Sequence, residues 1–203
     1  MKKFLPILLA FTFVFGLAGQ HSLAEGTNQY VVQRGDTMWK IAVKYKIGLS
    51  EIIRANWQIK NPALIYPNQK LTIPNIDNLK SFENQVITLT NQERAKNGLP
   101  ALQSDWQLSR VARYKSDDMK NKGYFSHTSP TYGSPFDMMK SFGVSYKTAG
   151  ENIAKGQSSP SQVVQSWMNS QGHRENILSR NFTHIGVGYA ENGNVWTQMF
   201  IGK

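Results

Sequence analysis

YVVQRGDTMWKIAVKYKIGLSEIIRANWQIKNPALIYPNQKLTIP, residues 30–74, is the stretch that decides the fold of the first part of the chain. It opens with Tyr30-Val31-Val32 and closes with Lys70-Leu71-Thr72-Ile73, two runs of the composition that β-strands favour. Between them, apolar residues recur at the three- and four-residue spacing of helices, on either side of Gly48. The predicted order is β-α-α-β, in a segment near the lower size limit for a core that folds unaided.

This stretch resembles a LysM domain over its whole length. The matching segments are Tyr30-Val31-Val32, Gly35-Asp36-Thr37, Ile41-Ala42, Asn56, Asn61-Pro62, Leu64-Ile65-Tyr66-Pro67 and Lys70-Leu71-Thr72-Ile73-Pro74. Asn68 departs from the family, which usually has glycine there, but asparagine tolerates the left-handed conformation that such a turn needs. Trp57 stands where many relatives have proline, and its indole either packs or offers an extra surface for sugar.

The resemblance implies that this module binds N-acetylglucosamine chains, such as peptidoglycan or chitin, in a shallow groove between two loops. The two walls would be formed by Gly35, Asp36, Thr37 and Met38 and by Leu64, Ile65, Tyr66 and Pro67. Backbone groups on such loops can pair with acetamido groups, while apolar side chains contact the sugar rings. The alternative is that Ile65 and Tyr66 only close the core. One small module should bind weakly, so retention needs a second contact or charge attraction.

The first 24 residues have the three parts of a secretory signal peptide. Lys2 and Lys3 precede an apolar run from Phe4 to Ala18, and Ser22-Leu23-Ala24 is a small-x-small cleavage site. The run is shorter than the roughly 20 residues that span a bilayer, which favours a cleaved signal over a retained anchor. Residues 1–24 are therefore predicted to be removed, with cleavage after Ala18 as the alternative, and no integral membrane segment is expected in the mature chain.

Charge and cysteine content indicate the surroundings of the mature chain. The sequence has no cysteine, and since small secreted animal domains usually depend on disulfides, an exported chain without them indicates a bacterial protein. Removing residues 1–24 removes two lysines and no acids, which lowers the net charge from +10 to +8. A basic secreted protein is attracted to polyanions. Because the basic residues are scattered, without an arginine-rich run, we expect anionic wall polymers as partners and no nucleic acid.

After a short polar linker, residues 75–80, a second domain is expected over residues 81–203. Helical spacing dominates up to Met168, with capping boxes predicted at Ser104–Gln107 and Ser159–Gln162. The period then changes to two on either side of Asn192-Gly193-Asn194, which is typical of a β-hairpin. Helices followed by an antiparallel pair predict an α+β fold, arranged as an α-β-α sandwich.

This second domain resembles the CAP superfamily, also called SCP-like, of the cysteine-rich secretory protein, antigen 5 and pathogenesis-related 1 type. The resemblance covers about residues 83–202. The matching segments are Asn91-x-x-Arg94, Gly98-Leu99-x-x-Leu102, Phe125-Ser126-His127-Thr128, Gly150-Glu151-Asn152-Ile153-Ala154, Trp167-x-x-Ser170-x-Gly172-His173-Arg174-x-Asn176-Ile177-Leu178, Ile185-Gly186-Val187-Gly188 and Trp196-Thr197-Gln198-x-Phe200.

The resemblance implies a cleft in which two histidines and two glutamates face one another, and in some members the histidines bind a divalent metal. His127 and His173 match the histidine positions and Glu151 matches one glutamate, with Asn152 and Arg174 beside them. The second glutamate usually follows the tryptophan of Trp167, where this chain has methionine. The set could still present three ligands to zinc and leave a fourth position open. The third histidine of the domain, His184, is expected to be structural.

Two classes of function stay open for this cleft. In the favoured one, the domain is a ligand- or metal-binding effector module of a secreted, cell-wall-associated protein, because no serine or cysteine nucleophile accompanies the histidines. In the alternative, it is a metal-dependent or acid–base hydrolase of wall peptide or protein, in which Glu151 alone would act as general base. The histidines and Glu151 are expected in loops or at the ends of elements. A vegetative wall and a spore envelope fit equally well.

Overall fold

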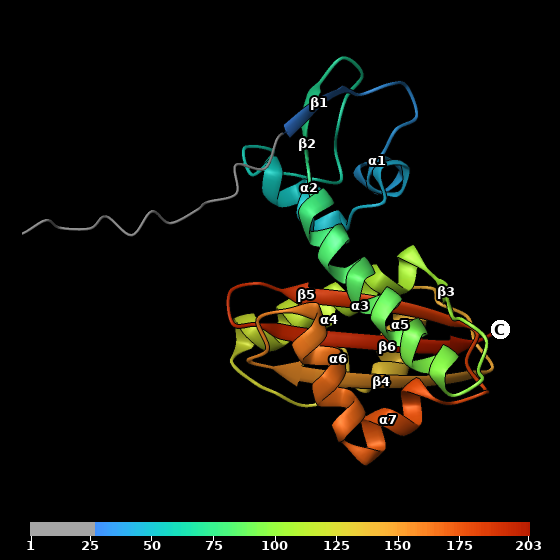
Figure 1. The fold of residues 1–203 in the computed structure, drawn as a ribbon. Helices are drawn as coiled ribbons and strands as arrows, with labels where there is room; N and C mark the ends of the chain where they lie inside the picture. The colour runs from blue at the N-terminus through green and yellow to red at the C-terminus, as the bar shows by residue number, and fades with distance from the viewer. Residues whose placement is uncertain (1–26) are drawn as a thin grey trace, which may run out of the picture.

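The computed structural model describes residues 27–203, and the predicted signal peptide lies outside them. Two domains follow one another along the chain (Figure 1). The smaller one, at the top of Figure 1, contains residues 27–74, and the larger one contains a four-stranded sheet covered by helices. The α+β class predicted from the sequence is confirmed.

The small domain has the predicted β-α-α-β order. It consists of β1 (Thr27–Val31), α1 (Met38–Tyr45), α2 (Leu49–Ala55) and β2 (Lys70–Pro74). The two strands are antiparallel, with Tyr30 opposite Leu71. Both helices pack their apolar faces on this pair, and the buried residues form one core: Val32, Met38, Ile41, Ala42, Ile47, Ile52, Leu71, Ile73 and Ile76.

Two asparagines determine how the long loop before β2 is fixed. Asn56 is 1% exposed; its Nδ2 donates to the carbonyls of Ile52 and Thr72, at 2.7 Å each, and its Oδ1 accepts from Thr72 N at 2.8 Å. One side chain thus ties α2 to β2. Asn68 has a φ of 69°, so this residue does adopt the left-handed conformation expected at the position where the family has glycine.

The expected linker differs from the observed chain. Helix α3 spans Asp77–Lys96, so most of residues 75–80 are helical. The reason is packing: Leu79, in the first turn of α3, contacts the hydrophobic cores of both domains. A segment that is polar in sequence therefore becomes a helical connection between the two cores.

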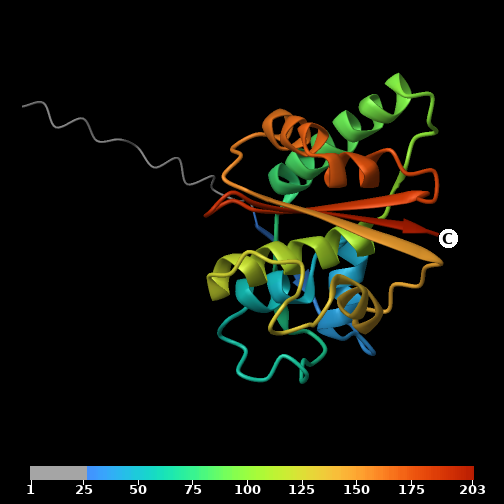
Figure 2. The ribbon, with the colours of Figure 1, turned by 90° about the horizontal axis from the view of Figure 1, so that it is seen from below.

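The large domain is a sheet between two layers of helices (Figure 2). The strand order is β3-β5-β6-β4, and β4 lies at one edge. The strands are β3 (Gln103–Ser104), β4 (Thr148–Lys155), β5 (His184–Ala190) and β6 (Val195–Gly202). The remaining helices are α4 (Trp106–Lys122), α5 (Pro135–Ser141), α6 (Pro160–Asn169) and α7 (Gln171–Ile177). The turn at residues 191–194 joins β5 to β6, as the hairpin prediction required.

Helix α4 lies directly against the sheet, and two glycines of β5 allow this. A Cβ atom added at Gly186 would overlap the backbone of Leu108, and one at Gly188 would overlap the backbone N of Arg113. No side chain fits in either place. Helices α3, α6 and α7 cover the opposite face, whose core includes Trp167 and Trp196.

One predicted cap is wrong by one residue. The N-cap of α4 is Asp105, whose Oδ1 accepts from the backbone N–H groups of Gln107 and Leu108 at 3.0 and 3.1 Å. Ser104 cannot take this role because it belongs to β3 and pairs with Ile185. At α6 half of the predicted capping box is present: Ser159 Oγ accepts from Gln162 N at 3.3 Å, but the Gln162 side chain accepts from Ser158 N at 2.9 Å and not from Ser159 N.

The two domains are in direct contact. The Ser50 backbone N–H of α2 donates to the Tyr114 hydroxyl of α4 at 2.8 Å. Arg113 lies between two carboxylates, with Nη1 3.3 Å from Glu51 of the small domain and Nε 2.9 Å from Glu83 of α3. Burial raises the pKa of Glu83 to about 8, against the opposing effect of the Arg113 charge.

A third contact is aromatic. The Arg110 guanidinium of α4 stacks on the Trp39 ring of α1, with 4.4 Å between Cζ and the ring centroid. With the ion pairs of Arg113, this contact gives the domains a fixed relative orientation rather than a flexible tether.

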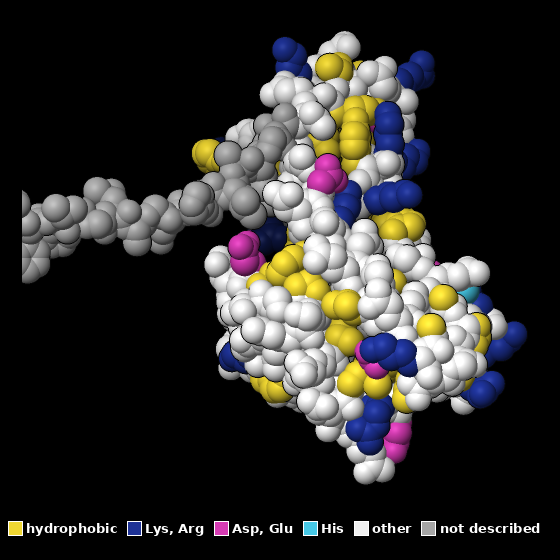
Figure 3. All heavy atoms as spheres, in the orientation of Figure 1, with side chains coloured by type: hydrophobic (Ala, Val, Ile, Leu, Met, Phe, Trp, Pro, Cys, Tyr) yellow, Lys and Arg dark blue, Asp and Glu magenta, His cyan; other side chains and the backbone are white. Residues whose placement is uncertain are grey.

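On the face in view in Figure 3, the basic side chains do not form one patch. Figure 3 shows lysine and arginine side chains distributed over both domains on the face in view. This agrees with the scattered basic residues of the sequence. Within residues 27–203, every helix is too short or too polar to cross a membrane.

Candidate functional site

The first predicted wall of the glycan groove is a tightly bonded turn. Asp36 Oδ2 accepts from Gln33 N at 2.8 Å and from the Tyr30 hydroxyl at 2.7 Å, and these two hydrogen bonds, in that order, lower the pKa of Asp36. Gly35 has a φ of 87°, which makes glycine the natural residue there. Thr37 caps α1 through Lys40 N. The polar side chains of this wall are therefore used within the turn, and its backbone is what a ligand would contact.

The second predicted wall carries the exposed apolar side chains. Leu64 is 54% and Tyr66 is 60% exposed, whereas Ile65 packs against the small core. The two walls are adjacent because Val32 and the turn at residues 68–69 exchange backbone hydrogen bonds of 2.9 Å. Pro67 is also exposed. Tyr66 and Leu64 are thus free to contact sugar rings.

Two further residues of this domain differ in exposure: Met38 is buried and Trp57 is exposed. Met38 is 2% exposed and belongs to the core, so its side chain takes no part in a surface groove. Trp57 is 83% exposed, so its indole does not pack in the core.

The residues predicted to form the site of the large domain lie near the edge of the sheet. His127 Nδ1 lies 2.8 Å from Glu151 Oε1. Glu151 is in the middle of edge strand β4 and His173 is in α7. The expectation that all three lie in loops or at element ends is therefore wrong for Glu151. The strand was missed because Glu151 and Asn152, two polar residues, are buried in it and interrupt the alternation of apolar residues.

Because side chains alternate along β4, Glu151 and Asn152 point to opposite faces of the sheet. Ile153 packs with Met119 of α4, so Glu151, two residues away, points to the same face of the sheet. Asn152 points to the opposite face, where α7 lies. Glu151 thus faces the layer of α4 and the His127 loop, whereas Asn152 faces the layer of α7, which carries His173.

The loop that carries His127 is fixed by two residues of α4 that sequence reasoning missed. Lys115 is fully buried, and its Nζ donates to the His127 carbonyl at 2.6 Å. Asp118 accepts from three hydroxyls of the loop: Tyr124 at 2.6 Å, Ser129 at 2.7 Å and Thr131 at 2.6 Å. The position of Lys115 could have revealed it. Lys115 lies on the face of α4 that carries the buried residues Val111, Ala112 and Met119, where a lysine is unusual.

His173 is positioned through a buried row of amides. Asn152 Nδ2 donates to the His173 carbonyl at 3.1 Å and to Gln198 Oε1 at 3.0 Å. Asn176 Nδ2 in turn donates to Asn152 Oδ1 at 2.9 Å. Asn152 is therefore a residue that orients the cleft from behind rather than one that faces a ligand.

Two other residues considered at the cleft make separate contacts. Arg174 Nη1 donates to the Met168 carbonyl at 2.8 Å, and among residues 27–203 no hydrogen bond or ion pair joins Arg174 to His127 or Glu151. His184 lies at the start of β5, with Nδ1 2.7 Å from the hydroxyl of Thr183. The position of His184 agrees with a structural role.

Burial controls the electrostatics of the cleft. The Glu151 side chain is 1% exposed, and this burial raises the pKa of Glu151, against the opposing effects of His127 and Lys115. Burial also lowers the pKa of His173, and the nearby charge of His127 lowers it further. Glu151 Oε2 is buried and has no hydrogen-bond partner among the described residues. A buried acceptor without a partner is costly, so a hydrogen-bond donor that reached Glu151 Oε2 would stabilise this arrangement.

The residues present do not fit a resident zinc ion with three protein ligands. Among residues 27–203, no group of three or more histidines, cysteines, aspartates or glutamates is placed to bind a metal. Glu151 Oε1 is engaged with His127 Nδ1, the arrangement in which a carboxylate orients a histidine. The glutamate that relatives carry after the tryptophan is Met168 here, which packs against the core. His127 and His173 alone could contribute two nitrogens.

Comparisons with known proteins define the class. The sequence model of the cysteine-rich secretory protein family, CAP, matches residues 87–201, more than half of the chain. A LysM domain model matches residues 30–74. The chain belongs to the CAP family and carries a LysM domain before its CAP domain.

Three similar proteins from bacilli illustrate the match. The uncharacterized protein YkwD of Bacillus subtilis (strain 168) is 68% identical over 125 residues, which cover 62% of this chain and 49% of YkwD. SpoIVD-associated factor A of the same strain is 44% identical over 45 residues, covering 22% of this chain and 12% of that protein. The crystal structure of an extracellular protein containing an SCP domain from Bacillus anthracis str. Ames aligns with a TM-score of 0.59 and 40% identity, covering 68% of this chain and 47% of that one. The chain thus spans about half the length of YkwD and of the B. anthracis protein.

Proposed function

We propose that this is a secreted protein of the bacterial cell envelope whose LysM domain binds the N-acetylglucosamine chains of peptidoglycan and whose CAP domain is a ligand-binding effector module. The LysM match supports carbohydrate binding, and the exposed Leu64 and Tyr66 supply the apolar contacts that such binding needs. The basic character of the chain adds attraction to anionic wall polymers. The 44% identity over 45 residues to the spore coat assembly protein ExsA of Bacillus cereus supports a spore envelope as one place of action.

The observation that carries the CAP half of the proposal is the buried carboxylate of Glu151. One oxygen of Glu151 orients His127, and the other is buried without a partner among the described residues. A hydroxyl or amide N–H of a ligand would satisfy that second oxygen, while the half-exposed His127 ring offers a second polar contact. The ligand is therefore a polar molecule with hydrogen-bond donors, such as a fragment of the wall.

Glycan binding is tested on the full chain by calorimetric titration with the N-acetylglucosamine tetramer and by sedimentation with insoluble peptidoglycan. Tyr66→Ala should weaken both, and Phe136→Ala, an aromatic residue of the large domain with 44% exposure, should weaken neither. Equal binding by both variants would place the sugar elsewhere.

The CAP cleft is tested by nuclear magnetic resonance of the His127 imidazole during titration with soluble wall fragments. The imidazole signal should shift in the wild type and not in Glu151→Gln, in which one oxygen of the carboxylate is replaced by a donor. No shift in either protein would contradict a wall ligand for this cleft. Titration with zinc in the same experiment tests whether His127 and His173 bind a metal between them, and loss of binding in His173→Ala would support that shared site.

A hydrolase is the second candidate, because burial raises the pKa of Glu151, and a carboxyl group with a raised pKa is better suited to hold and transfer a proton. His127 would then accept or return the proton across the 2.8 Å contact. Turbidity of a peptidoglycan suspension should fall with the wild type and stay constant with Glu151→Ala. Constant turbidity with both proteins would count against hydrolysis of the wall.

A further inference from the structure

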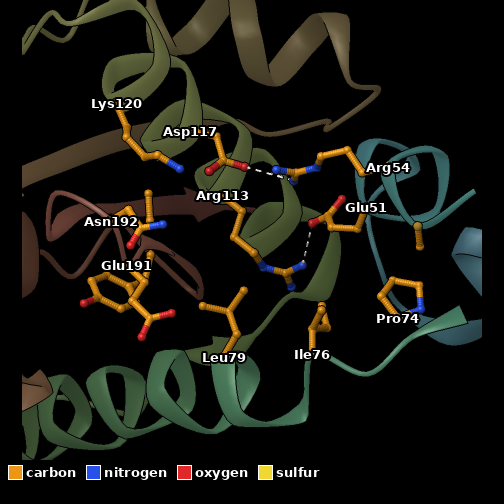
Figure 4. Close-up of a pocket in the computed structure, with 13 residues that line it drawn as sticks. Glu51, Arg54, Pro74, Ile76, Leu79, Arg113, Asp117, Lys120, Glu191 and Asn192 are labelled. Atoms are coloured by element: carbon orange, nitrogen blue, oxygen red, sulfur yellow. Dashed lines mark hydrogen bonds and ion pairs between the residues drawn. The ribbon is translucent and has the colours of Figure 1, made fainter. Parts of the chain in front are cut away.

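A cavity of about 440 Å³ lies where the two domains meet (Figure 4). Its walls come from α2 of the LysM domain, from the first turn of α3, from α4 and from the β5–β6 hairpin. Ligand pockets commonly have volumes of about 300–1,000 Å³ and commonly lie at domain interfaces. This cavity is separate from both the glycan groove and the His127 cleft, because none of the residues predicted for either site lines it.

The lining combines apolar surface with charges that are already paired. Ile76 and Tyr189 are buried and give the cavity apolar walls. Arg113 is engaged by Glu51 and Glu83, and Arg54 lies 3.5 Å from Asp117 across the domain boundary. The pairs Arg113–Glu51 and Arg54–Asp117 connect the two domains, so the cavity exists only in the assembled chain.

Three further polar side chains have no such partner. Lys120 of α4 and Glu191 of the hairpin line the cavity, and within residues 27–203 neither makes an ion pair or a side-chain hydrogen bond; the same holds for the Asn192 amide. Lys120 is close enough to Asp117 to oppose the rise in pKa that burial causes there. Figure 4 shows Lys120, Asn192 and Glu191 along one side of the cavity, across from Arg54 and Glu51.

We propose that this cavity binds a short peptide with free ends. The peptide carboxylate pairs with the Lys120 ammonium, the peptide ammonium pairs with the Glu191 carboxylate, and the Asn192 amide hydrogen-bonds the peptide group between them. An apolar side chain of the peptide packs against Ile76 and Tyr189. Charge-assisted hydrogen bonds of this kind are stronger than neutral ones.

The balance of charge favours this class of ligand over others. The basic and acidic residues that line the cavity are equal in number: Arg54, Arg113 and Lys120 against Glu51, Asp117 and Glu191. A polyanion would meet as much repulsion as attraction here. Glu191 and Asn192 are exposed and Lys120 is half-buried, so water solvates them in the empty cavity. A neutral glycan would gain nothing from the two charges, whereas a ligand with both signs of charge pairs with both.

The proposal is tested by calorimetric titration of the full chain with the tripeptide Ala-Leu-Ala in three forms: with free ends, with an acetylated N-terminus and with an amidated C-terminus. The free form should bind, and each blocked form should bind about tenfold more weakly, because each lacks one charge-assisted contact. Glu191→Gln should lower affinity for the free form by a similar factor and should abolish the effect of acetylation. Lys120→Met should lower affinity for the free form by a similar factor and should abolish the effect of amidation.

Two exposed residues outside the cavity lining give matched controls. Lys155→Met and Glu175→Gln change the same kinds of charge elsewhere on the large domain and should leave peptide binding unchanged. Failure of the free peptide to bind would overturn the proposal, as would equal binding of all three forms. Tighter binding of the N-acetylglucosamine tetramer in the wild type than in Lys120→Met and Glu191→Gln would assign the cavity to sugar instead.

Discussion

Removal of Arg113 tests the joint between the domains most directly. Arg113→Met keeps an unbranched side chain of similar length but leaves Glu83 and Glu51 without their shared cation. Removing one partner of a buried ion pair costs about 3–5 kcal/mol. The cost at pH 7 should be near the lower value, about 3 kcal/mol, because the pKa of Glu83 is already about 8 and the carboxyl can stay protonated. For a chain of this size this corresponds to a fall in Tm of about 6–12 °C.

The dependence on pH gives this prediction its sharpest form. The pKa of Glu83 is about 8 in the folded chain against 4.5 as its ordinary value, so the stability associated with its proton is fully present below pH 4.5 and is lost as the pH rises through 8. Without Arg113, whose charge lowers this pKa, the pKa of Glu83 rises further. The deficit of the variant should therefore be the same at pH 4 and pH 7, where Glu83 is protonated with or without Arg113, and should grow as the pH rises through 8.

Urea denaturation at pH 4, 7 and 9 measures this deficit. Arg180→Met is the matched control, since Arg180 is exposed and makes no ion pair within residues 27–203. Glu83→Gln added to Arg113→Met should recover part of the loss, because the amide that replaces the carboxyl group is neutral and its oxygen can still accept from Tyr189 N. A deficit that is the same at all three pH values, or one below about 1 kcal/mol at pH 7, would refute the reasoning.

Four other substitutions have expected outcomes. Gly188→Ala should destabilise the chain by at least about 3 kcal/mol in urea, because its Cβ would overlap the α4 backbone. Asn56→Ala should cost about 2–3 kcal/mol and speed hydrogen exchange at the Thr72 amide, which loses its acceptor. Asp118→Ala should leave three hydroxyls of the His127 loop without an acceptor and broaden the His127 resonances, with a cost of about 2–3 kcal/mol. Tyr66→Ala should weaken binding of the N-acetylglucosamine tetramer about tenfold in calorimetry without changing Tm.

Sequence patterns predict much of this fold where the conformation of a segment depends on residues only a few positions away. The helix spacing and the turn residues of residues 30–74 depend on neighbours a few positions away, and the β-α-α-β order follows from them. The hairpin at Asn192-Gly193-Asn194 follows for the same reason, since its turn needs backbone conformations that Gly193 and Asn194 provide. In such segments the sequence and the packed structure favour the same conformation.

Long-range contacts explain what was not predicted. Strand β4 carries Glu151 and Asn152 in its buried interior, where their side chains are satisfied by partners 21 or more residues away, such as His127, His173 and Asn176. Ser104 does not cap α4 because it pairs with a strand some eighty residues later in the chain. The His127 and His173 positions came from the resemblance of short motifs, whereas Lys115 and Asp118, which fix the loop, have no motif of their own. A cavity between two domains leaves no trace in either sequence segment.

Leu79 has a consequence for how such proteins can recombine. One side chain in the first turn of α3 fills space in both cores. A genetic fusion made within residues 75–80 would therefore leave a gap in one core or an exposed leucine in the other. The unit that can be exchanged intact between wall proteins is thus the pair of domains with α3 as their common helix. The two parts should then melt together, in a single transition, rather than one after the other.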